Sequence, residues 1–286
     1  MMFQPLAQIK AMAYMNRHNI EQMSTAAVRN VYLGNNLTLC RMLTKYKIYL
    51  DGRDAAVVPN ILMDGYWETW ITKFIAKTVE PGSYCIDAGA NFGYYSLLLA
   101  DLAGSHGKTI AVEPNAYLCK LLEMTSNVNE CGFQVINKAA ADQAGETTLS
   151  VPDHLWGSAT IISKVPAFDF GKKETVKTDS LDNMVKEANF PRVDFIKMDC
   201  EGAEPLIFSG MQHILKQNPA LKMVMEYSPF LYNDPAEFTE FLFKRFEVGE
   251  ITGDSTARIF TVEDTAFLLN LKDHIDIYLG PKPVIS

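Results

Sequence analysis

Acidic residues follow each of five short apolar runs in this sequence, and carboxylates at such positions can bind a cationic ligand or move a proton. If the runs are parallel strands of one sheet, the acids gather at the edge formed by the carboxyl ends, where such sheets bind ligands. Six acids at one edge are more than chance placement would supply. The acids are Asp87, Glu113, Asp142, Asp199, Glu201 and Glu226.

A glycine-containing loop, DAGANFG, occupies residues 87–93, directly at the end of the first run. Glycines allow a ligand to approach the backbone closely. The spacing differs from the dinucleotide fingerprint GxGxxG, because Asn91 and Tyr94 stand where the second and third glycines would be. Asp87 would repel a pyrophosphate, but it suits the ammonium group of S-adenosylmethionine, a nucleoside donor without phosphate.

Two further acids suit other parts of that donor. Glu113 follows the second run, where an acid can accept hydrogen bonds from both ribose hydroxyls. Asp142 follows the third run, where an acceptor would bind the adenine amino group. Asp87 alone could simply interact with the N-terminus of a helix. The loop and these acids together favour a nucleoside-binding site over that alternative.

The elements that must position these residues are alternating strands and helices. Near-continuous apolar runs separated by helical stretches are typical of a parallel sheet covered on both faces, so we expect an α/β fold. Ahead of it, a helical and β-hairpin extension occupies residues 1–60, and residues 61–286 form the main domain. The predicted strands are 84–87, 109–112, 133–136, 193–198 and 221–225, with β-like runs at 267–271 and 275–279, the hairpin at 47–58 and N-terminal helices over 5–30.

Composition excludes several classes of protein. The net charge is −8, from 26 Lys and Arg against 34 Asp and Glu, which argues against a nucleic acid partner. No apolar run reaches the roughly 18 residues of a membrane span. The five cysteines are odd in number and lack CxxC spacing, so we expect neither disulfides nor a zinc site. Reduced cysteines in turn favour a cytoplasmic location.

Three segments resemble known enzymes. The sequence YCIDAGANFGYYS at 84–96, followed by VEPN at 112–115, resembles the class I S-adenosylmethionine-dependent methyltransferases. The sequence DFIKMDCEGAE at 194–204 resembles the signature of the FkbM-type methyltransferases, and the resemblance extends over about residues 50–249. Supporting matches are GYWE at 65–68, Gly157-Ser158 and SLD at 180–182.

The resemblance implies a Rossmann-like sheet of strand order 3-2-1-4-5-7-6 with one antiparallel strand. It implies S-adenosylmethionine as the cofactor and O-methylation of a hydroxyl on a sugar, glycan or secondary metabolite. The acceptor would be a small molecule or a glycan, and the N-terminal helices suit a homodimer. The residues expected to bind the cofactor are Glu68, Asp87, Gly89, Asn91, Gly93, Ser96, Glu113, Asn115, Asp142 and Asp199.

Asp199 and Glu201 are our candidates for catalysis, because strand four lies beside strand one in this sheet order. One of the two would orient or deprotonate the acceptor hydroxyl, and two close carboxyls would raise the pKa of one of them. Alternatively, Asp199 only binds the cofactor and Glu201 caps the next helix. His154, in the long connection over 152–178, is a further candidate base. The histidines lack metal-ligand spacing, so we expect no metal.

Two other functions remain open from the sequence. An NAD-dependent oxidoreductase would use the same kind of sheet, although Asn91 and Tyr94 oppose it. A non-catalytic module would bind the cofactor without transferring a methyl group, but it would have no need of the acids at the strand ends.

Overall fold

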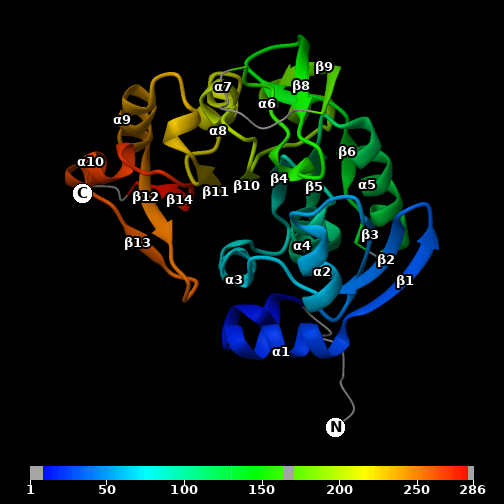
Figure 1. Cartoon of the computed structure of the whole chain (residues 1–286). Coiled ribbons are helices and arrows are strands. Elements are labelled where there is room, and N and C mark those ends of the chain that lie inside the picture. The colour runs from blue at the N-terminus through cyan, green and yellow to red at the C-terminus, as the bar shows by residue number, and fades with distance from the viewer. Residues whose placement is uncertain (1–8, 130, 164–170, 283–286) are drawn as a thin grey trace.

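A mixed sheet forms the centre of the molecule in the computed structural model, which describes residues 9–129, 131–163 and 171–282 (Figure 1). Within these ranges the sheet has eight strands in the order β13-β12-β14-β11-β10-β4-β5-β6. The strands are β4 (Tyr84–Ala88), β5 (Lys108–Val112), β6 (Gln134–Ile136), β10 (Phe195–Met198), β11 (Lys222–Tyr227), β12 (Phe246–Ile251), β13 (Ala257–Ile259) and β14 (Ile275–Pro281).

The topology places the ends of β4, β5 and β10 side by side. Numbered along the chain from β4 and without β13, the strands read 3-2-1-4-5-7-6, and β13 is an additional edge strand. Strand β14 is antiparallel to both of its neighbours, β11 and β12. The pairs β4–β5, β4–β10, β5–β6 and β10–β11 are parallel. Their carboxyl ends therefore meet at one edge.

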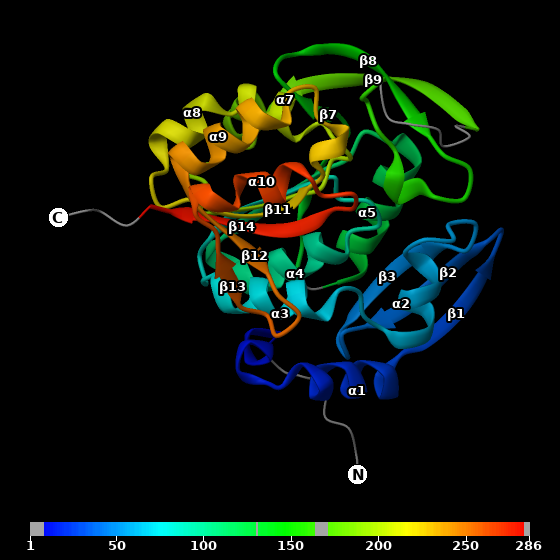
Figure 2. The same cartoon turned by 60° about the vertical axis from the view of Figure 1, so that its left-hand side comes forward.

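Helices cover both faces of this sheet, as expected for strands that are apolar on both sides (Figure 2). Along β4, Cys85 packs into the core on one face and Ile86 into the core on the other. The first core includes α3 (Thr69–Thr78), α4 (Tyr94–Ala103) and α5 (Ala116–Val128). The second includes α6 (Leu181–Glu187), α7 (Glu204–Ser209), α8 (Gln212–Gln217), α9 (Pro235–Arg245) and α10 (Thr265–Leu269).

The N-terminal extension contains more strand than the sequence indicated. A 3₁₀ helix (Ile9–Tyr14) and α1 (Arg17–Ala27) precede an antiparallel sheet of β1 (Arg29–Gly34), β2 (Leu37–Met42) and β3 (Tyr46–Asp51). The hairpin predicted at 47–58 is wrong, because β3 pairs with the preceding β2. Residues 55–58 lead instead into α2 (Val58–Asp64).

Two other local predictions need correction. The run at 267–271, predicted to be β-like, begins inside α10, where Leu268 is buried. The connection over 152–178 is not wholly irregular, because a third sheet in the order β7-β9-β8 reaches into it. Its strands are β7 (Ala139–Ala141), β8 (Gly145–Val151) and β9 (Lys172–Ser180). Among the helices described, none is both long and apolar enough to cross a membrane.

Candidate active site

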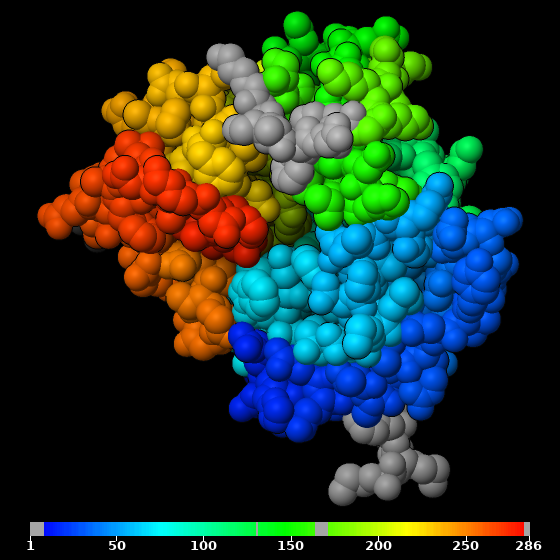
Figure 3. Space-filling model, viewed as in Figure 1, coloured from blue at the N-terminus to red at the C-terminus, as the bar shows by residue number. Residues whose placement is uncertain are grey.

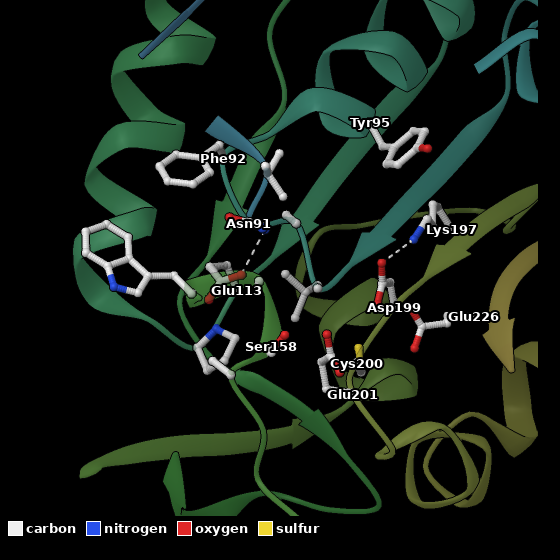
Figure 4. Close-up of a pocket in the computed structure, with 18 of the residues that line it drawn as sticks. Asn91, Phe92, Tyr95, Glu113, Ser158, Lys197, Asp199, Cys200, Glu201 and Glu226 are labelled. Atoms are coloured by element: carbon white, nitrogen blue, oxygen red, sulfur yellow. Dashed lines mark hydrogen bonds and ion pairs between the residues drawn. The ribbon is translucent and has the colours of Figure 1, made fainter. Parts of the chain in front are cut away.

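A pocket of about 250 Å³ opens at the carboxyl ends of β4, β5 and β10. The surface is hollowed where segments far apart in the chain meet (Figure 3). One end of the pocket is apolar and includes Val57, Phe92 and Trp156. The other end is charged, with Lys197, Asp199 and Glu226 across the pocket from Phe92 (Figure 4). The pocket thus suits a ligand with one flat apolar part and one charged part.

The glycine loop between β4 and α4 packs against the end of β10. Gly89, Asn91 and Gly93 all have positive φ angles, of 81°, 49° and 92°. A Cβ atom on Gly89 would lie 1.7 Å from the carbonyl oxygen of Asp199, so only glycine fits there. Gly89 and Asn91 line the pocket, whereas Gly93 packs against Leu122 beneath it.

Gly89→Ala is expected to abolish cofactor binding, because the added methyl group must push the loop away from Asp199. Gly82→Ala is the matched control. Gly82 has φ 84°, but a Cβ atom added to it would have no other atom within 4 Å. The control should cost only about 1–2 kcal/mol of stability from backbone strain. Urea unfolding and a titration with S-adenosylhomocysteine measure both effects, and equal cofactor affinity in the two variants would contradict this role of Gly89.

Glu113 holds the glycine loop from the end of β5. Its Oε2 accepts a hydrogen bond from the Asn91 amide at 2.9 Å, and its Oε1 accepts one from the Asn115 amide at 2.9 Å. Burial raises the pKa of Glu113 to about 7, against the lowering effect of these two amides. The Asn91 Oδ1 is buried and has no hydrogen-bond partner among the described residues. It is therefore an acceptor that a bound ligand would satisfy.

Asp87 lies behind the pocket surface. It is buried, and the Ser96 hydroxyl donates a hydrogen bond to its Oδ2 at 2.5 Å. Burial raises the pKa of Asp87 to about 6. Neither Asp87 nor Ser96 lines the pocket. Any interaction of Asp87 with the donor's ammonium group would therefore pass through an intermediate such as water.

Lys197 is the main site residue that we did not predict from the sequence. Its Nζ donates a hydrogen bond to Asp199 Oδ2 at 2.8 Å and lies 5.1 Å from the centroid of the Tyr95 ring. Burial alone would lower the pKa of Lys197, but Asp199, Glu68 and Asp276 reverse this effect and raise it. The ammonium group therefore stays charged. The available signal was a single lysine inside the apolar strand 195–198.

Glu68 reaches the same cluster from the residue before α3. Its Oε2 accepts a hydrogen bond from the Tyr95 hydroxyl at 2.6 Å. Burial, and after it the charge of Asp276, raises the pKa of Glu68 to about 7, whereas Lys197 lowers it. Glu68 lines the pocket, so it is placed where an acid can meet a ligand's ammonium group.

Glu201 and Glu226 form the acidic end of the pocket with Asp199. Burial raises the pKa of Glu201 to about 8, and the charges of Asp199 and Glu204 add to this effect. Burial, together with Asp199, Glu201 and Glu204, raises the pKa of Glu226 to about 10. Crowded carboxyls of this kind retain a proton near neutral pH and can exchange it with a ligand.

The alternative role of Glu201 as a helix cap is wrong. Helix α7 begins at Glu204, and its N-cap residue is Ala203, which provides no side-chain cap. The Glu201 residue itself has φ 52°, a strained backbone conformation for a non-glycine residue. Glu201 is therefore held at the pocket by the turn after β10 rather than used at the helix end.

Besides Asp87, Gly93 and Ser96, three more predicted site residues lie outside the pocket lining. The predicted placement of Asp142 is wrong, because β6 ends at Ile136 and Asp142 is exposed after β7 in another sheet. His154 is exposed, and its Nδ1 lies 3.0 Å from the Arg53 carbonyl oxygen, so the pocket does not contain the base predicted there. Asn115 caps α5, where its Oδ1 accepts hydrogen bonds from two backbone amides.

Comparisons with known proteins give one family. The model of the FkbM methyltransferase domain matches residues 87–250. No curated protein matches the chain.

Three of the solved structures to which the chain is similar are methyltransferases. The Pyrococcus abyssi tRNA (uracil-54, C5)-methyltransferase with S-adenosyl-L-homocysteine shares 10% identity over 86% of this chain and 44% of its own, at a TM-score of 0.44. The chain thus spans less than half of that enzyme. The Bacillus cereus O-methyltransferase in complex with SAH has 12% sequence identity, and the match covers 81% of this chain and 84% of that enzyme, at a TM-score of 0.40. The Geobacter metallireducens precorrin-6y C5,15-methyltransferase has 9% sequence identity, and the match covers 79% of this chain and 94% of that enzyme, at a TM-score of 0.44.

Proposed function

The chain belongs to the FkbM methyltransferase family, and on this premise we propose that it methylates a hydroxyl group of a sugar, glycan or secondary metabolite. The cofactor of such an enzyme is S-adenosylmethionine. The observation that carries the proposal is the position of Glu201, a carboxyl with a raised pKa in the pocket beside the glycine loop. A carboxyl with such a pKa ionises increasingly as the pH rises towards about 8, and its ionised form can remove a proton from a hydroxyl.

The residues of the pocket fit this cofactor. Glu113 would bind the ribose hydroxyls, and the unpaired Asn91 Oδ1 offers a further acceptor. The apolar end, with Val57 and Trp156, would contact the purine, and Glu68 would bind the ammonium group. When bound, S-adenosylmethionine supplies an electrophilic methyl group.

The chain's own residues then have separate tasks. Lys197 fixes Asp199 through the 2.8 Å hydrogen bond, so that Asp199 cannot turn freely in the pocket. Glu201 accepts the proton of the acceptor hydroxyl. The residues that line the pocket hold the reacting groups in line. In well-oriented reactions, such positioning lowers the activation barrier by up to roughly 7–11 kcal/mol.

The carboxyl groups of the pocket favour an uncharged acceptor rich in hydroxyls. The acceptor would face the carboxyl groups of Asp199, Glu201 and Glu226. Among the described residues that line the pocket, Lys197 is the only lysine or arginine. Carboxyl groups accept hydrogen bonds from hydroxyls, and they also donate them when protonated, so they can bind a hydroxyl-rich acceptor in either state. A sugar or polyol is favoured over a nucleic acid, because the described part of the pocket lining offers one lysine and no arginine to pair with phosphates.

Methyl transfer to a panel of acceptors tests this proposal. The wild-type enzyme is incubated with methyl-labelled S-adenosylmethionine and with glycans, polyols, amines and RNA, and the products are identified by mass spectrometry. We expect label in a methyl ether on a hydroxyl-bearing acceptor, and far less label in the same time when Glu201→Gln replaces the wild type. Label found only on nitrogen, on carbon or in RNA would overturn the proposal.

A further inference from the structure

One buried carboxylate, Asp54, ties the N-terminal extension to the wall of the pocket. Asp54 is 1% exposed. Its Oδ1 accepts hydrogen bonds from the amides of Ala56, Val57 and Val58 at 3.2, 2.9 and 3.2 Å. Its Oδ2 accepts one from the amide of Trp156 at 3.0 Å. Each oxygen of one side chain thus serves a different segment of the chain, and the two segments are about a hundred residues apart in the sequence.

Both segments that Asp54 joins form the apolar end of the pocket. Ala56 and Val57 line it from the extension, and residues 156–159 line it from the connection after β8. The second segment rests on the glycine loop, because the rings of Trp156 and Phe92 are stacked with centroids 6.2 Å apart. The apolar wall and the glycine loop are therefore in direct contact.

Further contacts hold the two segments together around Asp54. The Ala55 amide donates a hydrogen bond to the His154 carbonyl oxygen at 2.7 Å. The Arg53 guanidinium lies 5.1 Å from the centroid of the Trp156 ring and is held by hydrogen bonds to both oxygens of Asp51. His154, predicted from the sequence to be a base, thus belongs to this junction.

We infer that Asp54 is a positioning residue for the cofactor, and that the N-terminal extension thereby forms part of the donor site. Asp54 fixes Val57 and Trp156 as a wall against the purine of the donor, because a flat apolar group fits the apolar end of the pocket. The inference rests on the use of a purine-containing donor under the proposed function, but not on the identity of the acceptor.

Asp54→Asn tests the inference with the smallest change of shape. The amide oxygen can still accept from one segment, but the amide nitrogen cannot accept a hydrogen bond from the other. The matched control is Asp101→Asn. Asp101 joins the extension to α4 by accepting hydrogen bonds from Lys45 Nζ at 2.6 Å and from the Tyr46 hydroxyl at 2.9 Å, and it does not line the pocket.

The affinity for S-adenosylhomocysteine, measured by calorimetry, and the melting temperature are determined for both variants. We expect Asp54→Asn to weaken affinity by about tenfold or more, the usual effect of one lost buried hydrogen bond to a charged group. Asp101→Asn should lower the melting temperature but keep affinity within about twofold, because its contacts lie away from the pocket. Limited proteolysis of the free protein should cut faster near residues 152–160 only in Asp54→Asn.

Three other outcomes would each contradict either the positioning role of Asp54, the role of the apolar wall, or the proposed function. Equal affinities of Asp54→Asn and Asp101→Asn would overturn the positioning role. If Asp54→Asn does not fold, Trp156→Ala replaces it, and unchanged affinity in that variant would overturn the role of the wall. If the wild type itself does not bind S-adenosylhomocysteine, the failure lies with the proposed function, because the wall would then have no purine to contact.

Discussion

Glu201→Gln is expected to lower turnover by about 10²–10⁴-fold while leaving the affinity for S-adenosylmethionine within a few-fold. The range is the usual contribution of a positioned general base. The amide has nearly the same shape as the carboxyl but cannot take a proton from the acceptor hydroxyl. Turnover measured with saturating acceptor and affinity measured by calorimetry separate the two effects.

The pH dependence of turnover identifies the same group. Because burial, Asp199 and Glu204 raise the pKa of Glu201 to about 8, the carboxylate form grows as the pH rises towards that value. Wild-type turnover should therefore increase with pH and level off above about 8. This increase should disappear in Glu201→Gln.

Glu226→Gln is the matched control for this prediction. The pKa of Glu226 is raised to about 10, so Glu226 is protonated at neutral pH and glutamine resembles that form. Its replacement should affect turnover far less than the replacement of Glu201. The assignment of the base fails if the two variants lose equal activity, or if Glu201→Gln keeps the wild-type pH profile.

Lys197→Met is expected to lower the free energy of unfolding by about 2–3 kcal/mol, less than the usual cost of about 3–5 kcal/mol for breaking a fully buried ion pair, because the Asp199 side chain is 35% exposed. Lys197 is 2% exposed, and methionine would leave the carboxyls of Glu68 and Asp199 without their cation. Because the pKa of Glu68 is raised to about 7, Glu68 takes up a proton as the pH falls below that value, and the loss should shrink in acid. Denaturant unfolding at several pH values measures it.

An exposed ion pair provides the comparison. Lys244 pairs with Glu240 on α9, and their side chains are 72% and 66% exposed. Lys244→Met should change the free energy of unfolding by no more than about 0.5 kcal/mol, because solvent screens such pairs. Equal losses in Lys197→Met and Lys244→Met would mean that the buried cluster does not depend on its ammonium group.

The acids at the strand ends could largely be placed from the sequence. Glu113, Asp199, Glu201 and Glu226 all line the pocket, because the apolar runs before them are the central strands of one sheet. Asp142 could not be placed in this way. Strand β6 has only three residues, and the chain then passes into the separate strand β7, whose apolar alanines resemble a continuation of the same run.

Contacts between segments that lie far apart in the chain could not be predicted from the sequence pattern. The residues after β3 look like a hairpin turn, but β3 pairs with the strand before it, and the segment that follows turns towards Asp54. The run at 267–271 is too short for its periodicity to separate a strand from a helix. Lys197 stood alone in an apolar strand, and its partners Glu68 and Asp276 come from distant parts of the chain.

Calorimetric titration of the pocket tests the central claim most directly, namely that it binds a cationic nucleoside donor without phosphate. We predict saturable heat with S-adenosylmethionine and with S-adenosylhomocysteine, and no heat with NADH. Saturable binding of NADH, with no heat from either sulfur-containing nucleoside, would contradict the account.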